Sequence, residues 1–200
     1  MSHEKSSPSD EMHQLSQAEI DARVAGRGQL LPRFDGTPEE WPLFIELFRT
    51  STISCGYTQA ENVLRLRKHL HGKAYEAVRY LLLHPSTLEL AIAKLEMRFG
   101  TTRLICMSLL NKMCDLPAPK GDEWTTVMDF GLAVEGICRA ISAAGHVEYL
   151  NDFQTLEALV QKLPEDFQLE WVNQKANVRH PTLIEFGEWI ANRAKIISLT

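Results

Sequence analysis

Apolar residues recur along most of this chain at the three- and four-residue spacing of amphipathic helices. The clearest case follows the turn Phe34-Asp35-Gly36, where the apolar positions are Trp41, Phe44, Ile45 and Phe48. Thr37 and Glu40 form a capping box at its start, in which each side chain can bind the other residue's backbone N–H. The pattern predicts a helix from Pro38 to about Ser54, ended by Gly56.

The same pattern predicts helices along the rest of the chain. Capping boxes at Thr58–Glu61, Ser86–Glu89 and Thr182–Glu185 mark three helix starts, and glycine or proline marks the ends. The expected ranges are about 59–71, 73–83, 87–99, 104–115, 123–144, 151–163, 165–177 and 183–197. A shorter helix is expected from Ser16 to near Gly26. No segment alternates apolar and polar residues between hairpin turns, so the predicted fold class is all-α.

The helices are expected to form two small lobes joined by a short hinge at Gly100-Thr101-Thr102. We predict a mostly disordered tail over 1–29, because its first residues are polar and lack periodicity. The N-terminal lobe then covers 30–100 and the C-terminal lobe 101–200. Short connections favour antiparallel packing of consecutive helices within each lobe.

Composition narrows the functional class. The formal net charge of −5 argues against a dedicated nucleic-acid-binding domain, which normally carries a strongly basic face. No apolar run approaches the roughly 20 residues needed to cross a bilayer. The chain shows no secretory signal and no CxxC pair. We therefore expect a cytoplasmic protein whose thiols are reduced and largely buried, namely Cys55, Cys106, Cys114 and Cys138.

The sequence contains no recognisable catalytic or cofactor-binding motif, such as GxSxG, HExxH, a P-loop or a dinucleotide-binding glycine pattern. His69 and His71 lie two residues apart, so a helix would point them to different faces and they could not share one metal ion. We predict no enzyme activity, no metal and no cofactor. A Cys–His pair is the catalytic alternative that the sequence leaves open.

Two groups of residues are candidates for contact surfaces. Arg65, Arg67 and Lys68 form the strongest positive cluster, which is either a solvated helix face or a basic rim facing nucleic acid or a pore. Trp171 and Val172 are candidates for an assembly interface, since an exposed tryptophan is a frequent contact hot spot. The alternative for Trp171 is a place in the core.

Four segments also carry a family resemblance. They are LPRFDGTPEEWPLFIELFRTSTISCGY at 31–57, YTQAENVLRLRKHLHGKAYEAV at 57–78, AIAKLEMRFG at 91–100, and the region from LPAPK at 116–120 to LVQKLP at 159–164. In order and spacing they resemble the capsid region of the Gag protein of Bel/Pao-type LTR retrotransposons. The resemblance covers about residues 30–198.

The resemblance implies a two-lobed helical protein similar in plan to retroviral capsids. Such proteins self-associate into shells that enclose the RNA of the element. We therefore expect a structural protein that forms homo-oligomers and virus-like particles in the cytoplasm, without membrane contact. The chain has no zinc knuckle, so RNA would be bound through segments outside it. The alternative is a host-adopted, capsid-derived adaptor that takes up a peptide or protein partner in a groove between helices.

Overall fold

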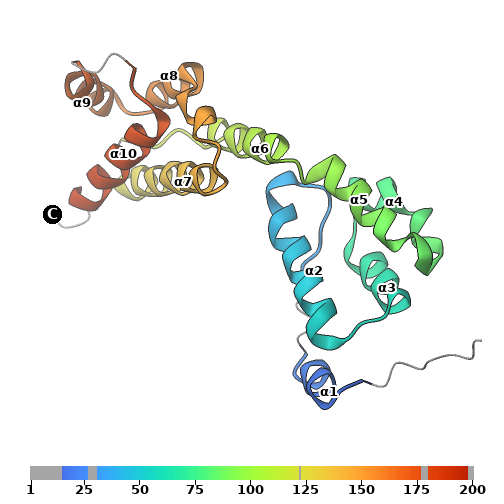
Figure 1. The fold of residues 1–200 in the computed structure, drawn as a ribbon. Helices are drawn as coiled ribbons and strands as arrows, with labels where there is room; N and C mark the ends of the chain where they lie inside the picture. The colour runs from blue at the N-terminus through green and yellow to red at the C-terminus, as the bar shows by residue number, and fades with distance from the viewer. Residues whose placement is uncertain (1–14, 27–30, 122, 177–179, 198–200) are drawn as a thin grey trace, which may run out of the picture. The chain divides into compact units, whose positions relative to one another are not determined.

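The computed structural model describes residues 15–26, 31–121, 123–176 and 180–197. These residues form helices and no sheet, which confirms the predicted all-α class (Figure 1). Residue contacts divide the chain into two compact units. Unit 1 holds the described residues up to Gly36 together with Glu40–Arg98, and unit 2 holds Thr37–Glu39 and the described residues from Phe99 onward. The lobe boundaries predicted at 100 and 101 stay a prediction.

The helices of the first half of the chain pack their predicted apolar faces inward. They are α1 (Gln17–Val24), α2 (Trp41–Cys55), α3 (Gln59–His69), α4 (Gly72–Val78) and α5 (Leu88–Phe99). Their core is built around Phe34, whose ring lies 5.1 Å from that of Phe44 and 5.4 Å from that of Trp41. Leu66, Leu70, Leu82 and Leu95 are fully buried in the same unit. Burial of these large side chains is the main stabilising contribution to unit 1.

The segment before α2 alters the end of α3. The Phe34 N–H donates to the His69 carbonyl at 2.9 Å, and the His71 N–H donates to the Phe34 carbonyl at 2.8 Å. This isolated bridge holds Leu70 in an extended conformation, so α3 ends at His69. The prediction of a helix to His71 stopped by Gly72 was therefore wrong. Gly72 instead begins α4 with a φ of +47°, which glycine adopts without strain.

Two of the predicted helix starts also differ. A 3₁₀ turn over Pro38–Glu40 precedes α2, which begins at Trp41 with Pro42 in its first turn. Ser86 does not cap α5 as predicted: it lies in the 3₁₀ turn Pro85–Thr87, where its hydroxyl is bonded to His84 Nδ1 at 2.8 Å. The capping boxes predicted at Thr58–Glu61 and Thr182–Glu185 are confirmed.

The short helix expected after Ser16 is present as α1. Its capping box pairs Ser16 with Glu19. Ala22 is buried, and the Arg23 guanidinium donates to the Cys55 and Gly56 carbonyls at the end of α2. Residues 1–14 and 27–30 of the predicted tail lie outside the described residues.

Unit 2 is organised around its longest helix. Its elements are α6 (Thr102–Cys114), α7 (Trp124–Ala143), a 3₁₀ helix at Val147–Asn151, α8 (Phe153–Gln161), α9 (Glu165–Lys175) and α10 (Leu183–Ile197). α7 and α10 lie side by side (Figure 1). A Cβ added at Gly131 would come within 3.2 Å of the Ile190 backbone. Gly131 therefore permits the close approach of α7 and α10, whereas a Cβ at Gly136 would face open space.

Candidate assembly surfaces

Arg65 does not belong to a solvent-facing basic rim. Its guanidinium donates to Thr52 Oγ1 at 3.0 Å, to Asn62 Oδ1 at 2.7 Å and to the Ser51 hydroxyl. It also lies over the Tyr57 ring, 4.3 Å from the centroid. Burial lowers the pKa of Arg65. Arg65 thus connects the end of α2 to α3, which corrects its assignment to a contact surface.

Arg67 and Lys68 are the exposed part of the predicted basic rim. Both lie in the last turn of α3, where a positive charge is favourable beside the C-terminal carbonyls. The neighbouring His69 is half-buried, and its pKa is lowered first by burial and then by the charges of Lys68 and Arg65. The structure therefore leaves a patch of two cations in place of the predicted three.

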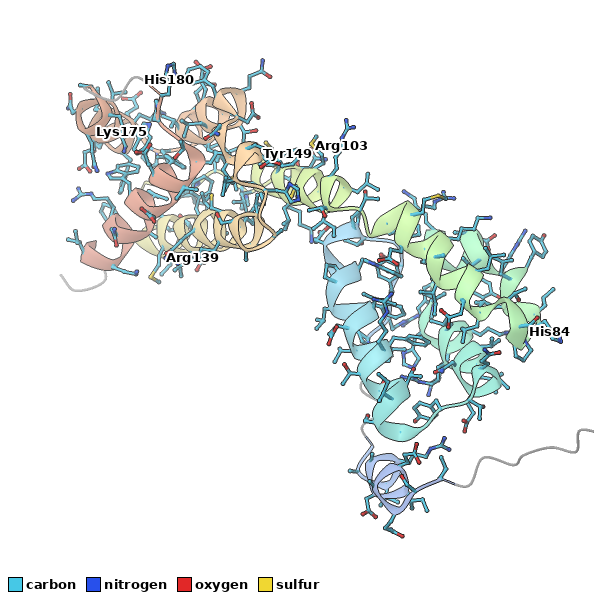
Figure 2. All side chains as sticks on the ribbon, viewed as in Figure 1. His84, Arg103, Arg139, Tyr149, Lys175 and His180 are labelled. Carbon is cyan, nitrogen blue, oxygen red and sulfur yellow. The ribbon has the colours of Figure 1, made fainter. Side chains whose placement is uncertain are left out.

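Trp171 lies in the core of unit 2. It is 5% exposed, and its ring meets Phe186 edge-on, with 5.1 Å between the centroids. The Trp189 ring centroid is 5.2 Å away, and the Lys175 ammonium lies 5.3 Å from the Trp171 centroid. Lys175, labelled in Figure 2, follows Trp171 by one turn of α9. The proposed role of Trp171 in an exposed assembly interface is therefore wrong. The apolar faces of α9 and α10 enclose it.

Val172 remains a candidate surface residue, and a second exposed apolar residue lies beside it on α9. It is 59% exposed, and Leu169, one helical turn earlier on α9, is 64% exposed. A three-residue separation places both side chains on one helix face. Leu169 was not predicted as a surface residue, although it stands two positions from Trp171 and so cannot share the inward face of α9.

A second apolar face lies on α5. The inward face consists of five buried residues, whereas Leu90 and Met97 are 57% and 69% exposed; the buried residues are Leu88, Ala91, Ile92, Leu95 and Phe99. Lys94 lies between Leu90 and Met97 on the same side of the helix. Leu90 and Met97 stand at i and i+7 on one helix face, a spacing from which the sequence could have indicated this surface.

Unit 2 carries an apolar groove between α7 and the proline-containing loop that precedes it. Its volume is about 390 Å³, and it is lined by Leu116, Pro117, Ala118, Pro119, Lys120, Thr126, Asp129, Phe130 and Ala133. Both ends of the loop are held. Lys162 Nζ donates to the Leu116 carbonyl at 2.5 Å, and the Lys120 N–H donates to Thr126 Oγ1 at 2.8 Å. The groove is therefore preformed.

The thiols give no sign of nucleophilic activation. Cys55, Cys106 and Cys138 are buried, and Cys114 is partly buried. Burial, with a smaller effect of Glu135, raises the pKa of Cys138 to about 12. Within the described ranges, no three metal-ligating side chains gather at one place. None of the described helices combines the length and apolar character of a membrane span.

Comparison with known families identifies the family to which this all-helical chain belongs. The family described as "Protein of unknown function (DUF1759)" matches residues 34–180, and the chain belongs to it. This family is typically found in retrotransposon Gag- and capsid-like proteins. No curated protein matches the chain. No solved structure matches it either.

Proposed function

We propose that this chain is a Gag-like capsid subunit of the Bel/Pao type that self-assembles into oligomers and virus-like particles. The observation that supports this most strongly is family membership over residues 34–180, because the family is typical of Gag- and capsid-like proteins. The all-helical fold agrees with it. The resemblance in the segments between 31 and 164 supplies the finer Bel/Pao assignment.

The surface supplies contacts that self-association can use. Leu90 and Met97 on α5, and Leu169 and Val172 on α9, are large apolar side chains exposed in pairs. Single exposed apolar residues are ordinary, whereas grouped ones mark contact sites. Each such contact is small, but many of them in one shell act together through a high effective concentration. Copies with a net charge of −5 repel one another, and salt screens this repulsion.

The proposal extends to cargo and place of action. The particles form in the cytoplasm and enclose the RNA of the element. Arg67 and Lys68 form a small positive patch on α3, so most RNA contacts come from other segments of the Gag protein. The chain performs no reaction, contacts no membrane and has further copies of itself as its main partner.

A salt and crowding series on the purified full chain tests this function. We expect dynamic light scattering to show large species as salt rises, and negative-stain electron microscopy to show regular particles. A nuclease-protection assay on the same sample tests RNA enclosure separately. Monomers under every condition would overturn the assembly proposal.

The preformed groove favours one alternative, a capsid-derived adaptor that binds a peptide. Its apolar lining and fixed walls suit an apolar side chain of an extended or helical segment. Selection from a displayed peptide library distinguishes the two functions. Binding of a selected peptide by a stable monomer would favour the adaptor.

A further inference from the structure

The α7 groove combines an apolar floor with the exposed carboxylate of Asp129. Phe130, Pro119 and Ala133 supply apolar lining. At the rim, Lys120 is paired with Glu123 at 3.0 Å. Asp129 is exposed and forms no ion pair with any residue in the described part of the chain. A complementary occupant therefore has apolar side chains and a positive charge beside them.

The outward face of α5 has this composition. Leu90, Lys94 and Met97 stand at i, i+4 and i+7, within one side of the helix. The two apolar side chains are exposed and flank the ammonium group over roughly 10 Å of helix. Among the described residues, Lys94 has no ion-pair partner. The α5 face and the α7 groove are thus two unlike surfaces that complement each other in both polarity and charge.

We propose that α5 of one copy docks on the α7 groove of a second copy, with Leu90 or Met97 in the groove and Lys94 paired with Asp129. The inference rests on the proposed self-assembly and names the contact that it uses. The occupant is a second copy because the chain itself carries the apolar and charged side chains that the groove lacks. The groove is already formed, so docking requires little ordering of the loop.

The contact joins two different surfaces, so it is heterologous. Each docked copy still offers a free α5 and a free groove, and the contact propagates until a ring closes. An isologous contact, by contrast, would stop at a dimer. One heterologous contact therefore builds rings, and a shell needs further contacts between rings, for which the exposed pair Leu169 and Val172 of α9 is available.

Charge exchange between the two surfaces tests the proposal. Lys94→Glu places two negative charges at the contact, and Asp129→Lys places two positive charges there. We expect each variant to need about tenfold more protein than the wild type to assemble, since small losses multiply over many contacts. Lys73→Glu and Glu157→Lys are the matched controls. They make the same charge changes at exposed positions of α4 and α8 and are expected to assemble as the wild type does.

Two rescue experiments identify the partner surfaces. The double variant Lys94→Glu/Asp129→Lys restores opposite charges and is expected to assemble near the wild-type concentration. An equimolar mixture of the two single variants restores opposite charges only between unlike copies, so we expect it to assemble where neither variant does alone. Circular dichroism of every variant checks that the helices are intact.

The outcomes separate this inference from the proposed function. Failure of the wild type to assemble overturns both. If the wild type assembles and the single variants behave like their controls, the docking contact is wrong and the capsid function stands. Rescue by the double variant without rescue by mixing would place the pair within one chain, and no rescue at all would show that the two surfaces meet other partners. Both results overturn docking between copies.

Discussion

Arg23 and Glu61 form a two-point ion pair that joins α1 to the start of α3. Arg23 Nη1 lies 2.9 Å from Glu61 Oε1, and Nη2 lies 3.1 Å from Oε2. The same guanidinium donates to the Cys55 carbonyl at 2.7 Å and to the Gly56 carbonyl at 3.0 Å. One side chain therefore satisfies carbonyls at the end of α2 and holds the carboxylate that caps α3.

Replacement of Arg23 by alanine is expected to release α1. The helix has only eight residues, which is too short for stability without tertiary contacts. We expect a loss of about 1–2 kcal/mol in the free energy of unfolding, because the lost bonds are charge-assisted but partly exposed. Hydrogen exchange of the α1 amides measures the release directly.

Arg139→Ala is the matched control for Arg23→Ala. Arg139 lies on α7 (Figure 2). It pairs with Glu135 of the same helix and does not join two elements. We expect little change in stability and none in the exchange of α1. Equal protection of α1 in the wild type and in Arg23→Ala would show that another contact holds this helix.

We expect the protein to lose stability in acid through the Glu61 carboxylate. Burial raises its pKa, but the hydrogen bonds from the Thr58 N–H and from Arg23 outweigh burial and hold the pKa below its usual value. A group with a lowered pKa stabilises the fold above its unfolded pKa of about 4.3, and this stabilisation is lost as the pH falls through the folded pKa. Glu61→Gln is therefore expected to be less stable than the wild type at pH 7 and nearly equal to it in acid.

Urea unfolding of both proteins between neutral and acid pH measures this difference. The informative quantity is the gap between the two free energies of unfolding at each pH. A gap that stays constant down to the most acid pH would contradict the role of the ionised carboxylate.

Local signals in the sequence predicted much of the fold. The buried stripe of α5 and the capping boxes of Thr58 and Thr182 depend on residues three or four positions apart, so sequence reveals them. The end of α3 depends on Phe34, which lies 36 positions from its bridge partner Leu70 (70 − 34). No local rule foresees such a pairing, which is why the helix was predicted to continue.

The candidate surfaces were harder to predict than the helices. Arg65 was predicted as a surface cation from the sequence, yet its guanidinium is partly buried because it donates hydrogen bonds to Thr52 and Asn62. Trp171 is enclosed because Phe186 and Trp189 of α10 fold over it. Both outcomes follow from contacts between separate helices. The α7 groove likewise exists only because Lys162 and Thr126 hold the ends of the proline-containing loop.

The two glycines of α7, Gly131 and Gly136, lie in different surroundings, so the same substitution is expected to have opposite effects on stability. A Cβ at Gly131 would stand 3.2 Å from backbone atoms of Ile190, and a packed helix backbone cannot easily give way. We expect Gly131→Ala to cost about 1–2 kcal/mol through overpacking, even after the gain in helix propensity. Gly136→Ala meets nothing within 4 Å and is expected to stabilise by up to about 1 kcal/mol. Thermal unfolding of both variants tests these opposite signs, and a shared sign would contradict the role of Gly131 in the α7–α10 contact.

Adjacent residues on α9 are expected to separate stability from assembly. Trp171→Ala removes a buried ring from the cluster with Phe186 and Trp189, so we expect a loss of about 3–5 kcal/mol in the free energy of unfolding. Val172→Lys changes an exposed position and is expected to alter stability by no more than about 0.5 kcal/mol. If the exposed pair Leu169 and Val172 contacts other copies, the lysine raises the protein concentration needed for assembly.

Chemical unfolding of both variants measures the change in stability, and light scattering measures the change in assembly. Normal assembly of Val172→Lys would remove this face of α9 from the particle contacts, and an unchanged unfolding midpoint in Trp171→Ala would contradict its place in the core.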